Sequence, residues 1–383
     1  MEPIEKLRLL SSASETEKGE DGFCSQRDGS LRGIILTHAT LPNGRRTTLL
    51  KSLLTSICEN DCLYCPMRAG RDFRRTTFQP DEFARLAANL TRAGLIQGVF
   101  LSSGVAGGGV RTQDRLIACA ETLRWKIGYR GYIHLKIMPG AEYDQVLASM
   151  RVADRVSVNL EAPNAMRLPA LAPKKEFERD LMATIRLISH IRNTHDPTRA
   201  WKSRWPSSCT QFVVGGAEES DKELLSTSQH LHREHDLLRV YYSALTPTAG
   251  TPFADHTPIP RQREQRLYQA DYLIRDYGFS ESELAYDAAG QLPLEKDPKV
   301  MWADQHLLYA PVEVNIASRE ELLRIPGIGP VGAERVISAR RVRAITSLSM
   351  LKRIGISTER AKAYITLDGK YAARQLPLFS FAG

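Results

Sequence analysis

The chain has 383 residues, of which 42% are hydrophobic and 25% are charged, and its formal net charge at pH 7 is +8. It has six cysteines, no apolar N-terminal segment and no apolar run long enough to span a membrane. These features exclude a membrane-spanning protein and a secreted protein built on disulfides. We therefore expect a cytoplasmic protein whose thiols are reduced.

Residues 1–45 are predicted to form an N-terminal segment outside the main core. Residues 11–30 (SSASETEKGEDGFCSQRDGS) are polar and poor in apolar side chains, which is typical of a flexible connector. Cys24 belongs to this connector. The first folded unit is therefore expected to begin near residue 46.

Residues 46–286 are predicted to form an α/β barrel. Helix-length segments separate six strand-like runs, and segment 111–128 carries apolar residues at helical spacing. The strand-like runs are 47–57, 98–101, 131–137, 155–160, 210–214 and 237–245, and two further helical segments are 79–93 and 261–277. Six such units indicate a partial (β/α)6 TIM-like barrel, in which active sites lie at the C-terminal ends of the strands.

Cys58, Cys62 and Cys65 lie in the run ICENDCLYC, on the loop that leaves the first strand. This CxxxCxxC triplet supplies three thiolates. Three protein ligands on a cubane iron–sulfur cluster leave one iron open. The spacing therefore indicates a site that both binds and reacts.

Structural zinc is the main alternative, but it normally takes four ligands from two CxxC-like pairs. A fourth ligand would have to come from elsewhere in the chain, and none of the candidates forms a second pair. The candidates are Cys24, Cys119, Cys209 and the nine histidines.

The cysteine loop resembles the signature of the radical S-adenosylmethionine (SAM) superfamily, which has an aromatic residue before the last cysteine, here Tyr64. The resemblance implies a [4Fe–4S] cluster on the three cysteines, with SAM chelating the fourth iron. One electron from the reduced cluster then breaks a carbon–sulfur bond of SAM and yields a 5′-deoxyadenosyl radical. Zinc has no redox state for this step. A small electron-donor protein such as ferredoxin or flavodoxin is an expected partner.

Residues at the later strand ends resemble the family's SAM-binding pattern by position. Ser102, Ser103 and Gly104 stand where the family often has a Gly-Gly-Glu turn for the SAM amino group, although the acid is missing. Lys136 shares a face of the third strand with His134. We expect Lys136 either to face the SAM carboxylate or to be a surface lysine.

The fourth and fifth strands complete this predicted cofactor site. Ser157, Asn159 and Glu161 alternate along one strand, which indicates either ribose binding inside the barrel or a polar exposed edge. Segment 211–218 resembles the family's GxIxGxxE motif beside the adenine, with glutamine replacing the first glycine. The resemblance assigns Val213 and Gly215 to the cofactor site.

Two basic runs of the barrel have open interpretations. Segment 67–75 (MRAGRDFRR) follows the last cysteine and is either a nucleic-acid contact near the barrel mouth or a solvated loop. Segment 199–205 (RAWKSRW) mixes cations with two tryptophans. Its tryptophans either stack on an extruded base or pack the barrel rim.

Residues 287–311 are predicted to be a linker, 312–371 a small all-α domain, and 372–383 a C-terminal tail. Ser318 and Glu321 form a capping box for a short helix, and the run PGIGPVG opens a second one. Glycines at that position free backbone amides that bind phosphate. The segment resembles the helix-hairpin-helix motif, which grips the sugar–phosphate backbone of DNA, and 349–365 resembles a degenerate second copy. The alternative is a helical hairpin used for protein contacts.

The charge of this C-terminal segment favours a nucleic acid. Residues 312–374 contain twelve Lys and Arg against six Asp and Glu, hence +6 of the total of +8. The residues expected to contact the duplex backbone are Gly327, Ile328, Gly329, Val331, Gly332, Arg335, Arg340, Lys352 and Arg353.

Barrel and hairpins together resemble a family described as radical SAM proteins of DNA modification or repair, whose genes lie beside a uracil-DNA-glycosylase-like partner. The resemblance implies a radical SAM [4Fe–4S] enzyme that acts on DNA. Two alternatives stay open at this point. One is an RNA-modifying radical SAM enzyme, and the other is a noncatalytic DNA-binding iron–sulfur redox sensor.

Overall fold

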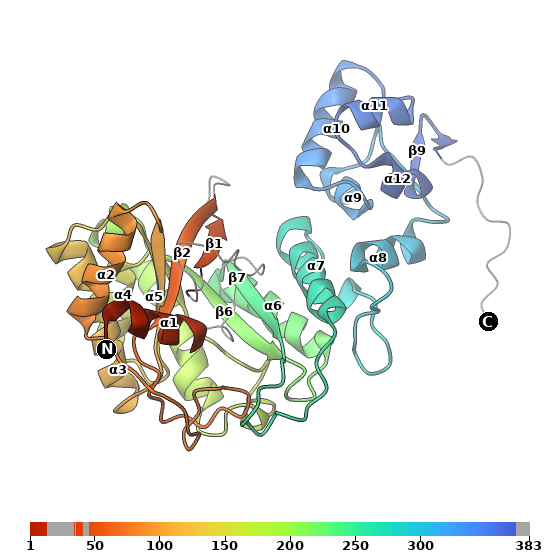
Figure 1. Ribbon diagram of the computed structural model, residues 1–383. Coiled ribbons are helices and arrows are strands. Elements are labelled where there is room, and N and C mark those ends of the chain that lie inside the picture. Colours follow the sequence, from red (N-terminus) through yellow and green to blue (C-terminus); the bar gives the residue numbers. More distant parts are fainter. Residues whose placement is uncertain (14–33, 35, 41–45, 373–383) are drawn as a thin grey trace. The chain divides into compact units, whose positions relative to one another are not determined.

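The computed structural model describes residues 1–13, 34, 36–40 and 46–372 (Figure 1). The chain divides into two compact units. The first comprises residues 1–219 and 230–264, and the second comprises residues 220–229 and 265–383. The predicted connector around Cys24 and the predicted tail beyond residue 372 lie outside the described residues.

The first unit is built on a seven-stranded sheet with the order β1-β2-β3-β4-β5-β6-β7. Strands β2 to β7 are parallel to one another, which confirms the predicted partial barrel, and β1 adds an antiparallel strand at one edge. The strands are β1 (Leu36–Thr40), β2 (Arg46–Leu53), β3 (Gly98–Ser102), β4 (Tyr132–Lys136), β5 (Arg155–Ser157), β6 (Ser207–Val214) and β7 (Arg239–Ala244).

Helices connect the parallel strands, and those between β2 and β6 cover the outer face of the sheet (Figure 1). The helices are α1 (Pro3–Ala13), α2 (Pro80–Arg92), α3 (Gly108–Glu121), α4 (Tyr143–Val152), α5 (Ala183–Thr194), α6 (Asp221–His235) and α7 (Arg261–Tyr277). The predicted helices 79–93 and 261–277 correspond to α2 and α7. No helix in the described ranges is long and apolar enough to cross a bilayer.

Helix α2 shows how local sequence directs these elements. Gln79 and Glu82 form a capping box at its start, and proline occupies the first turn, where its missing N–H costs nothing. Phe83, Ala84 and Ala87 then face the core and are fully buried. Apolar residues that recur at helical spacing thus pack one face of α2 against the barrel.

Within the second unit, the part from residue 298 to residue 372, called the C-terminal unit below, contains helices α8 to α12 and a small sheet with the order β10-β9-β8. The helices are α8 (Pro298–His306), α9 (Arg319–Arg324), α10 (Pro330–Val342), α11 (Leu348–Arg353) and α12 (Thr358–Ala361), and the strands are β8 (Val312–Glu313), β9 (Ile365–Leu367) and β10 (Lys370–Tyr371). The prediction of an all-α domain was therefore wrong. Asp368 and Gly369 have φ of 56° and 72°, and such a two-residue turn reverses β9 into β10.

The predicted linker at 287–311 was also wrong, because it contains α8. Asp297 caps this helix by accepting a hydrogen bond from the Lys299 amide at 2.9 Å, and Pro298 follows at the first helical position. Ala303 and Leu307 belong to the apolar core of the C-terminal unit. The segment is therefore part of a folded core, despite its high content of charge and proline.

A buried ion pair closes the barrel at the amino ends of the parallel strands. Arg124 and Asp154 lie 2.7 Å apart, and their side chains are 0% and 6% exposed. Arg124 also donates to the carbonyls of Tyr129 and Val152, each at 2.8 Å. Burial lowers the pKa of Arg124, while Asp154 raises it. The pair therefore joins the segments that enter β4 and β5.

The tryptophans of segment 199–205 lie at this same edge, away from the cysteine loop. The guanidinium of Arg124 lies 4.3 Å from the ring centroid of Trp201. Trp205 is buried and donates its indole N–H to the carbonyl of His195 at 3.1 Å. Of the two interpretations of this segment, packing of the barrel rim therefore describes Trp205. The segment precedes β6, and the amino ends of parallel strands lie opposite the active-site edge.

We expect Arg124→Met to destabilise the first unit by about 3–5 kcal/mol, because a buried carboxylate and several carbonyls lose their donor. Arg179→Met is the control, since Arg179 is 74% exposed and pairs only with its neighbour Asp180 among the described residues. Denaturant unfolding followed by circular dichroism measures both. Equal unfolding midpoints for the two variants would contradict a stabilising role for the pair.

Candidate active site at the carboxyl ends of the strands

The three cysteines lie on the loop that follows β2, at the carboxyl edge of the parallel sheet. None of the three forms a disulfide in the described part of the chain, and Cys62 is buried while Cys58 and Cys65 are half-buried. The Cys65 amide donates to the carbonyl of Cys62 at 3.1 Å, which makes a tight turn between the last two. The loop therefore presents three thiols where α/β barrels carry their chemistry.

The loop after β3 holds this cysteine loop through Glu59. The Glu59 amide donates to the carbonyl of Val105 at 2.8 Å. The Glu59 carboxylate accepts the amides of Gly107 and Gly108, the latter at 3.2 Å, at the start of α3. Both glycines have positive φ. Glu59 thus supplies the anion that a helix N-terminus favours, and it does so from within the chain.

The close approach of these two loops requires Gly104. A Cβ on Gly104 would lie 2.3 Å from the carbonyl oxygen of Ile57 and 3.2 Å from the Cβ of Cys58. The Gly104 amide also donates to the carbonyl of Thr55 at 2.8 Å. The predicted Ser102-Ser103-Gly104 turn therefore lies directly against the cysteine loop.

An iron–sulfur cluster and a single metal ion require different arrangements of the thiols. Within the described part of the chain, no group of three or more His, Cys, Asp or Glu side chains surrounds one ion position. A structural zinc site needs four ligands around one point. In a cluster each thiolate binds a different iron, so three thiols on one loop need not converge on one atom. The cysteine loop therefore fits a cluster.

Charged groups behind the loop affect the thiols. Burial raises the pKa of Cys62, whereas Lys175 lowers it. Burial and the carboxylate of Glu161 raise the pKa of Tyr64 well above its usual value. Glu161 and Lys175 form an ion pair at 2.8 Å. Neither residue was linked to the cysteines by the sequence, because this contact depends on the loop after β5.

The predicted SAM-binding residues gather along the same edge. In the sheet register Lys136 lies beside Ser157, and the Val213 amide donates to the carbonyl of Glu161 at 2.7 Å. Asn159 is half-buried, and Lys136 is 8% exposed. The structure therefore brings residues from β4, β5 and β6 to the side of the cysteine loop.

Two of these residues have surroundings that the sequence did not indicate. The Oγ of Ser157 is hydrogen-bonded to Nε2 of His134 at 2.9 Å, and the His134 ring stacks on Phe100 at 4.2 Å. Glu161 has a φ of 65°, so it breaks the strand alternation that placed it on the face of Ser157 and Asn159. Its side chain instead meets Lys175.

The glycine turn after β6 is closed by Glu219 rather than by Glu218, the acid expected from the motif. Glu219 is fully buried at its side chain, and its carboxylate accepts the amides of Gly215 and Ala217, the latter at 3.0 Å. Glu218 is exposed and has a φ of 54°. Burial raises the pKa of Glu219, while the amides lower it.

The basic run after the cysteines is structural. Arg75 donates to four backbone carbonyls, including that of Ser56 at 2.7 Å. Arg71 donates to the carbonyls of Pro66 and Ala249 at 2.8 Å and 3.1 Å. These two guanidinium groups brace the loop, so neither the nucleic-acid nor the solvated-loop interpretation describes them.

In the C-terminal unit, the predicted phosphate-binding turn connects α9 to α10. Gly327 has a φ of 88°, Ile328 is 1% exposed, and Gly329 is the N-cap of α10. Val331, in the first turn of α10, is 65% exposed. The buried Ile328 therefore holds the turn in the core, while Val331 at the beginning of α10 is exposed to solvent.

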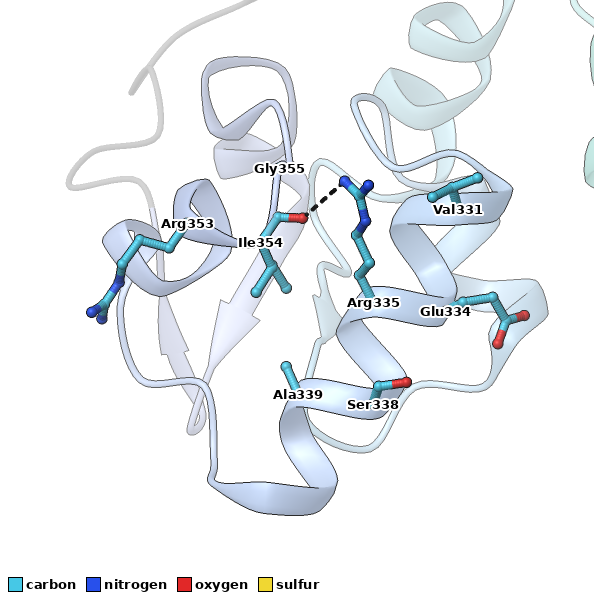
Figure 2. A pocket seen from close by; sticks show the side chains of 8 residues that line it. All are labelled: Val331, Glu334, Arg335, Ser338, Ala339, Arg353, Ile354 and Gly355. Atoms are coloured by element: carbon cyan, nitrogen blue, oxygen red, sulfur yellow. Dashed lines mark hydrogen bonds between the residues drawn. The ribbon is translucent and has the colours of Figure 1, made fainter. Parts of the chain in front are cut away.

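A groove of about 760 Å³ runs between α10 and the end of α11, and Figure 2 shows its lining. Arg335 extends from α10 and donates to the carbonyl of Ile354 at 3.3 Å. Arg353 and Lys352 are exposed, whereas Arg340 donates to the carbonyl of Val314 at 2.8 Å. Of the four predicted cations, Arg335 and Arg340 thus donate to backbone carbonyls, and Arg335, Lys352 and Arg353 are exposed.

Residues 52–231 match the family model described as the radical SAM superfamily. This range contains the cysteine loop and the ends of β3 to β6. It is a radical SAM domain. The chain therefore carries a domain similar to those of radical SAM enzymes, a family whose cofactors are a [4Fe–4S] cluster and SAM. In such enzymes the bound cofactors supply a carbon-centred radical from SAM.

The chain is also similar to individual proteins of known identity. It is 29% identical over 157 residues to biotin synthase of Syntrophotalea carbinolica, which covers 37% of this chain and 47% of that protein. The hydrogenase maturase HydG of Carboxydothermus hydrogenoformans is 15% identical, with 59% of this chain and 50% of that chain covered and a TM-score of 0.45. Methylornithine synthase is 12% identical, with 59% and 62% covered and a TM-score of 0.44. The chain thus spans about half the length of the curated relative it matches.

We expect Cys58→Ala, Cys62→Ala and Cys65→Ala each to lose most of the bound iron, because each thiolate holds one iron of the cluster. Cys119→Ala is the matched control, since Cys119 is buried in α3 and belongs to another part of the barrel. Iron and sulfide analysis after anaerobic reconstitution measures the effect. Four irons per chain in the Cys62→Ala protein would contradict the assignment.

Proposed function

We propose that this radical SAM enzyme acts on DNA, with the barrel as the reaction site and the C-terminal unit as the binding site for the duplex backbone. The observation that carries the proposal is the pair of glycine turns in the C-terminal unit. The match to the radical SAM family ends at residue 231, so it does not include these turns. A hydrogen atom would be taken from a nucleotide by the 5′-deoxyadenosyl radical.

The first turn supports phosphate binding because it ends at the beginning of a long helix. Helix α10 runs from Pro330 to Val342, and Gly329 caps it without a side chain. The first N–H groups of a helix have no acceptor within it, and they carry the positive end of the helix dipole. The amides of Val331 and Gly332 are therefore available to an anion.

The second turn repeats this design beside the first. Gly355 has a φ of 84°, and Ile356 after it is 4% exposed, which parallels Gly327 and Ile328. A Cβ on Gly327 would lie 2.6 Å from the carbonyl of Ser357. The two turns are thus in direct contact, which favours the predicted double motif and adjacent contacts on one backbone.

Charge in the groove between the turns also favours a polyanion. Arg335 and Arg353 lie on its two sides, and Figure 2 shows that Arg353 points away from Arg335. Glu334 also lines the groove, but it pairs with Arg319 at 2.7 Å. With that carboxylate compensated, the side chains that line the groove carry a net positive charge. Phosphate contacts of this kind give affinity without base specificity.

The reaction proposed for the barrel requires an electron donor and a cluster loop that the substrate can reach. The half-buried Cys58 and Cys65 leave the cluster loop accessible at the carboxyl edge. We propose ferredoxin or flavodoxin as the electron donor, and a uracil-DNA-glycosylase-like protein as a further partner. Lys136, Asn159 and Glu161 are proposed to bind SAM, with the turn at Gly215.

We expect DNA to stimulate formation of 5′-deoxyadenosine, because substrate binding commits the radical to hydrogen abstraction. The measurement is anaerobic incubation of the reconstituted enzyme with SAM and reductant, with damaged duplex, undamaged duplex or RNA, followed by chromatography of the nucleoside. Stimulation by RNA alone would favour the RNA-modifying enzyme. Absence of SAM cleavage in the cluster-loaded protein would favour the redox sensor.

We expect Arg335→Ala and Arg353→Ala to weaken duplex binding equally for all sequences. Each should lower the slope of log affinity against log salt by about 1, because each cation displaces about one counterion. Fluorescence anisotropy with labelled duplexes at several salt concentrations measures this. Lys370→Ala is the control, because Lys370 is an exposed cation on β10, outside the groove.

Glycine variants complete this test. Gly327→Val should abolish binding, because valine is strained at a φ of 88° and would collide with the second turn. If the arginine and glycine variants all bind duplex normally while remaining folded, the hairpins are a protein-docking module.

A further inference from the structure

The segment after β5 forms the wall behind the cysteine loop. The Leu63 amide donates to the carbonyl of Leu171 at 2.8 Å. A few residues on, Lys174 Nζ donates to the carbonyl of Glu59 at 3.0 Å. The segment thus contacts the loop on both sides of Cys62, the most buried of the three cysteines.

The next residue, Lys175, turns inward and places a buried positive charge behind the cysteines. Lys175 Nζ lies 2.8 Å from Oε1 of Glu161, and their side chains are 10% and 3% exposed. The other oxygen of Glu161 is buried without a hydrogen-bond partner among the described residues. A charged pair with so few hydrogen bonds gains little stability, since desolvation offsets the attraction. Stability alone therefore does not account for this buried pair.

Lys175 interacts electrostatically with the thiols as well as with its carboxylate partner. Burial lowers the pKa of Lys175, but Cys62, Glu161 and Cys58 raise it, in that order, and the net shift is upward. At Cys62 the effect of Lys175 likewise exceeds the opposite effect of Glu161. The ammonium therefore stays charged, and it follows directly on the segment that contacts the cysteine loop on both sides of Cys62.

We propose that Lys175, oriented by Glu161, is a positioning residue that raises the reduction potential of the cluster held by Cys58, Cys62 and Cys65. Three thiolates make this cluster anionic, and reduction adds one more negative charge. A fixed positive charge in a medium of low dielectric constant stabilises the reduced form more than the oxidised form.

The step involves one electron from an external one-electron donor, and no bond in the protein forms or breaks. Lys175 keeps its proton in both oxidation states, so its contribution is the charge and not a titration. The inference rests on the cluster alone and is independent of the proposal that the enzyme acts on DNA.

The test is the midpoint potential of the reconstituted full-length protein without SAM, obtained by anaerobic redox titration with the reduced cluster followed by electron paramagnetic resonance. We expect Lys175→Met to shift the potential to a more negative value. Glu161→Gln should shift it in the opposite direction, because the ammonium then acts unopposed. Lys175→Arg should restore a potential close to that of the wild type.

Lys174→Met is the matched control, because this neighbouring lysine contacts only the Glu59 carbonyl among the described residues. Its potential should be unchanged. The Lys175→Met/Glu161→Gln double variant avoids an unpaired buried carboxylate, and its shift should be negative but smaller than that of Lys175→Met. If Lys175→Met fails to hold a cluster, Glu161→Gln and the double variant decide. Unchanged potentials in those two, or shifts of the opposite sign, would overturn the proposal.

Discussion

Main-chain hydrogen bonds between the cysteine loop and other strand ends are the constraint on which the site depends. Glu59 is bound to Val105 after β3, and Leu63 to Leu171 after β5. A loop of this length would otherwise sample many conformations, at a cost of roughly 1–2 kcal/mol per residue to order. Because these contacts are made by the backbone, they fix the arrangement of the three thiols.

The same kind of buried ion pair has different consequences at the two edges of the barrel. Arg124 and Asp154 are surrounded by backbone carbonyls, so the pair closes the end of the barrel and has no reactive neighbour. Lys175 and Glu161 are surrounded by the cysteine loop. Burial strengthens the electrostatic interactions of both pairs. The groups around each pair determine whether these interactions stabilise the barrel or influence the proposed cluster site.

The distribution of cations supports a division of labour between the two units. In the barrel, Arg71 and Arg75 use their donors on backbone carbonyls beside the cysteines. In the C-terminal unit, Arg353 is exposed beside a groove and a glycine turn. Net charge alone does not separate these cases, because a guanidinium with filled hydrogen bonds does not recruit phosphate. This difference favours the C-terminal unit as the proposed nucleic-acid site.

The sequence by itself determined the features that are encoded within a short window. The spacing of Cys58, Cys62 and Cys65, the six strand-like runs and the capping box at Ser318 all follow from local periodicity or local hydrogen bonding. The cluster loop and the parallel barrel could therefore be predicted. The turn at Asp368 and the cap at Asp297 were also local signals, and they were missed within charged segments.

Only the tertiary structure decided which charged side chains meet. Glu161 reaches Lys175 because its φ of 65° takes it out of the strand alternation, and Glu59 reaches Gly107 across two separate loops. Arg75 likewise donates to the carbonyl of Ser56, which only folding brings within its reach. Long polar side chains choose partners by distance in space, and a sequence pattern records distance along the chain. The sequence pattern therefore predicted where the site lies, and the tertiary structure determined which charged groups surround it.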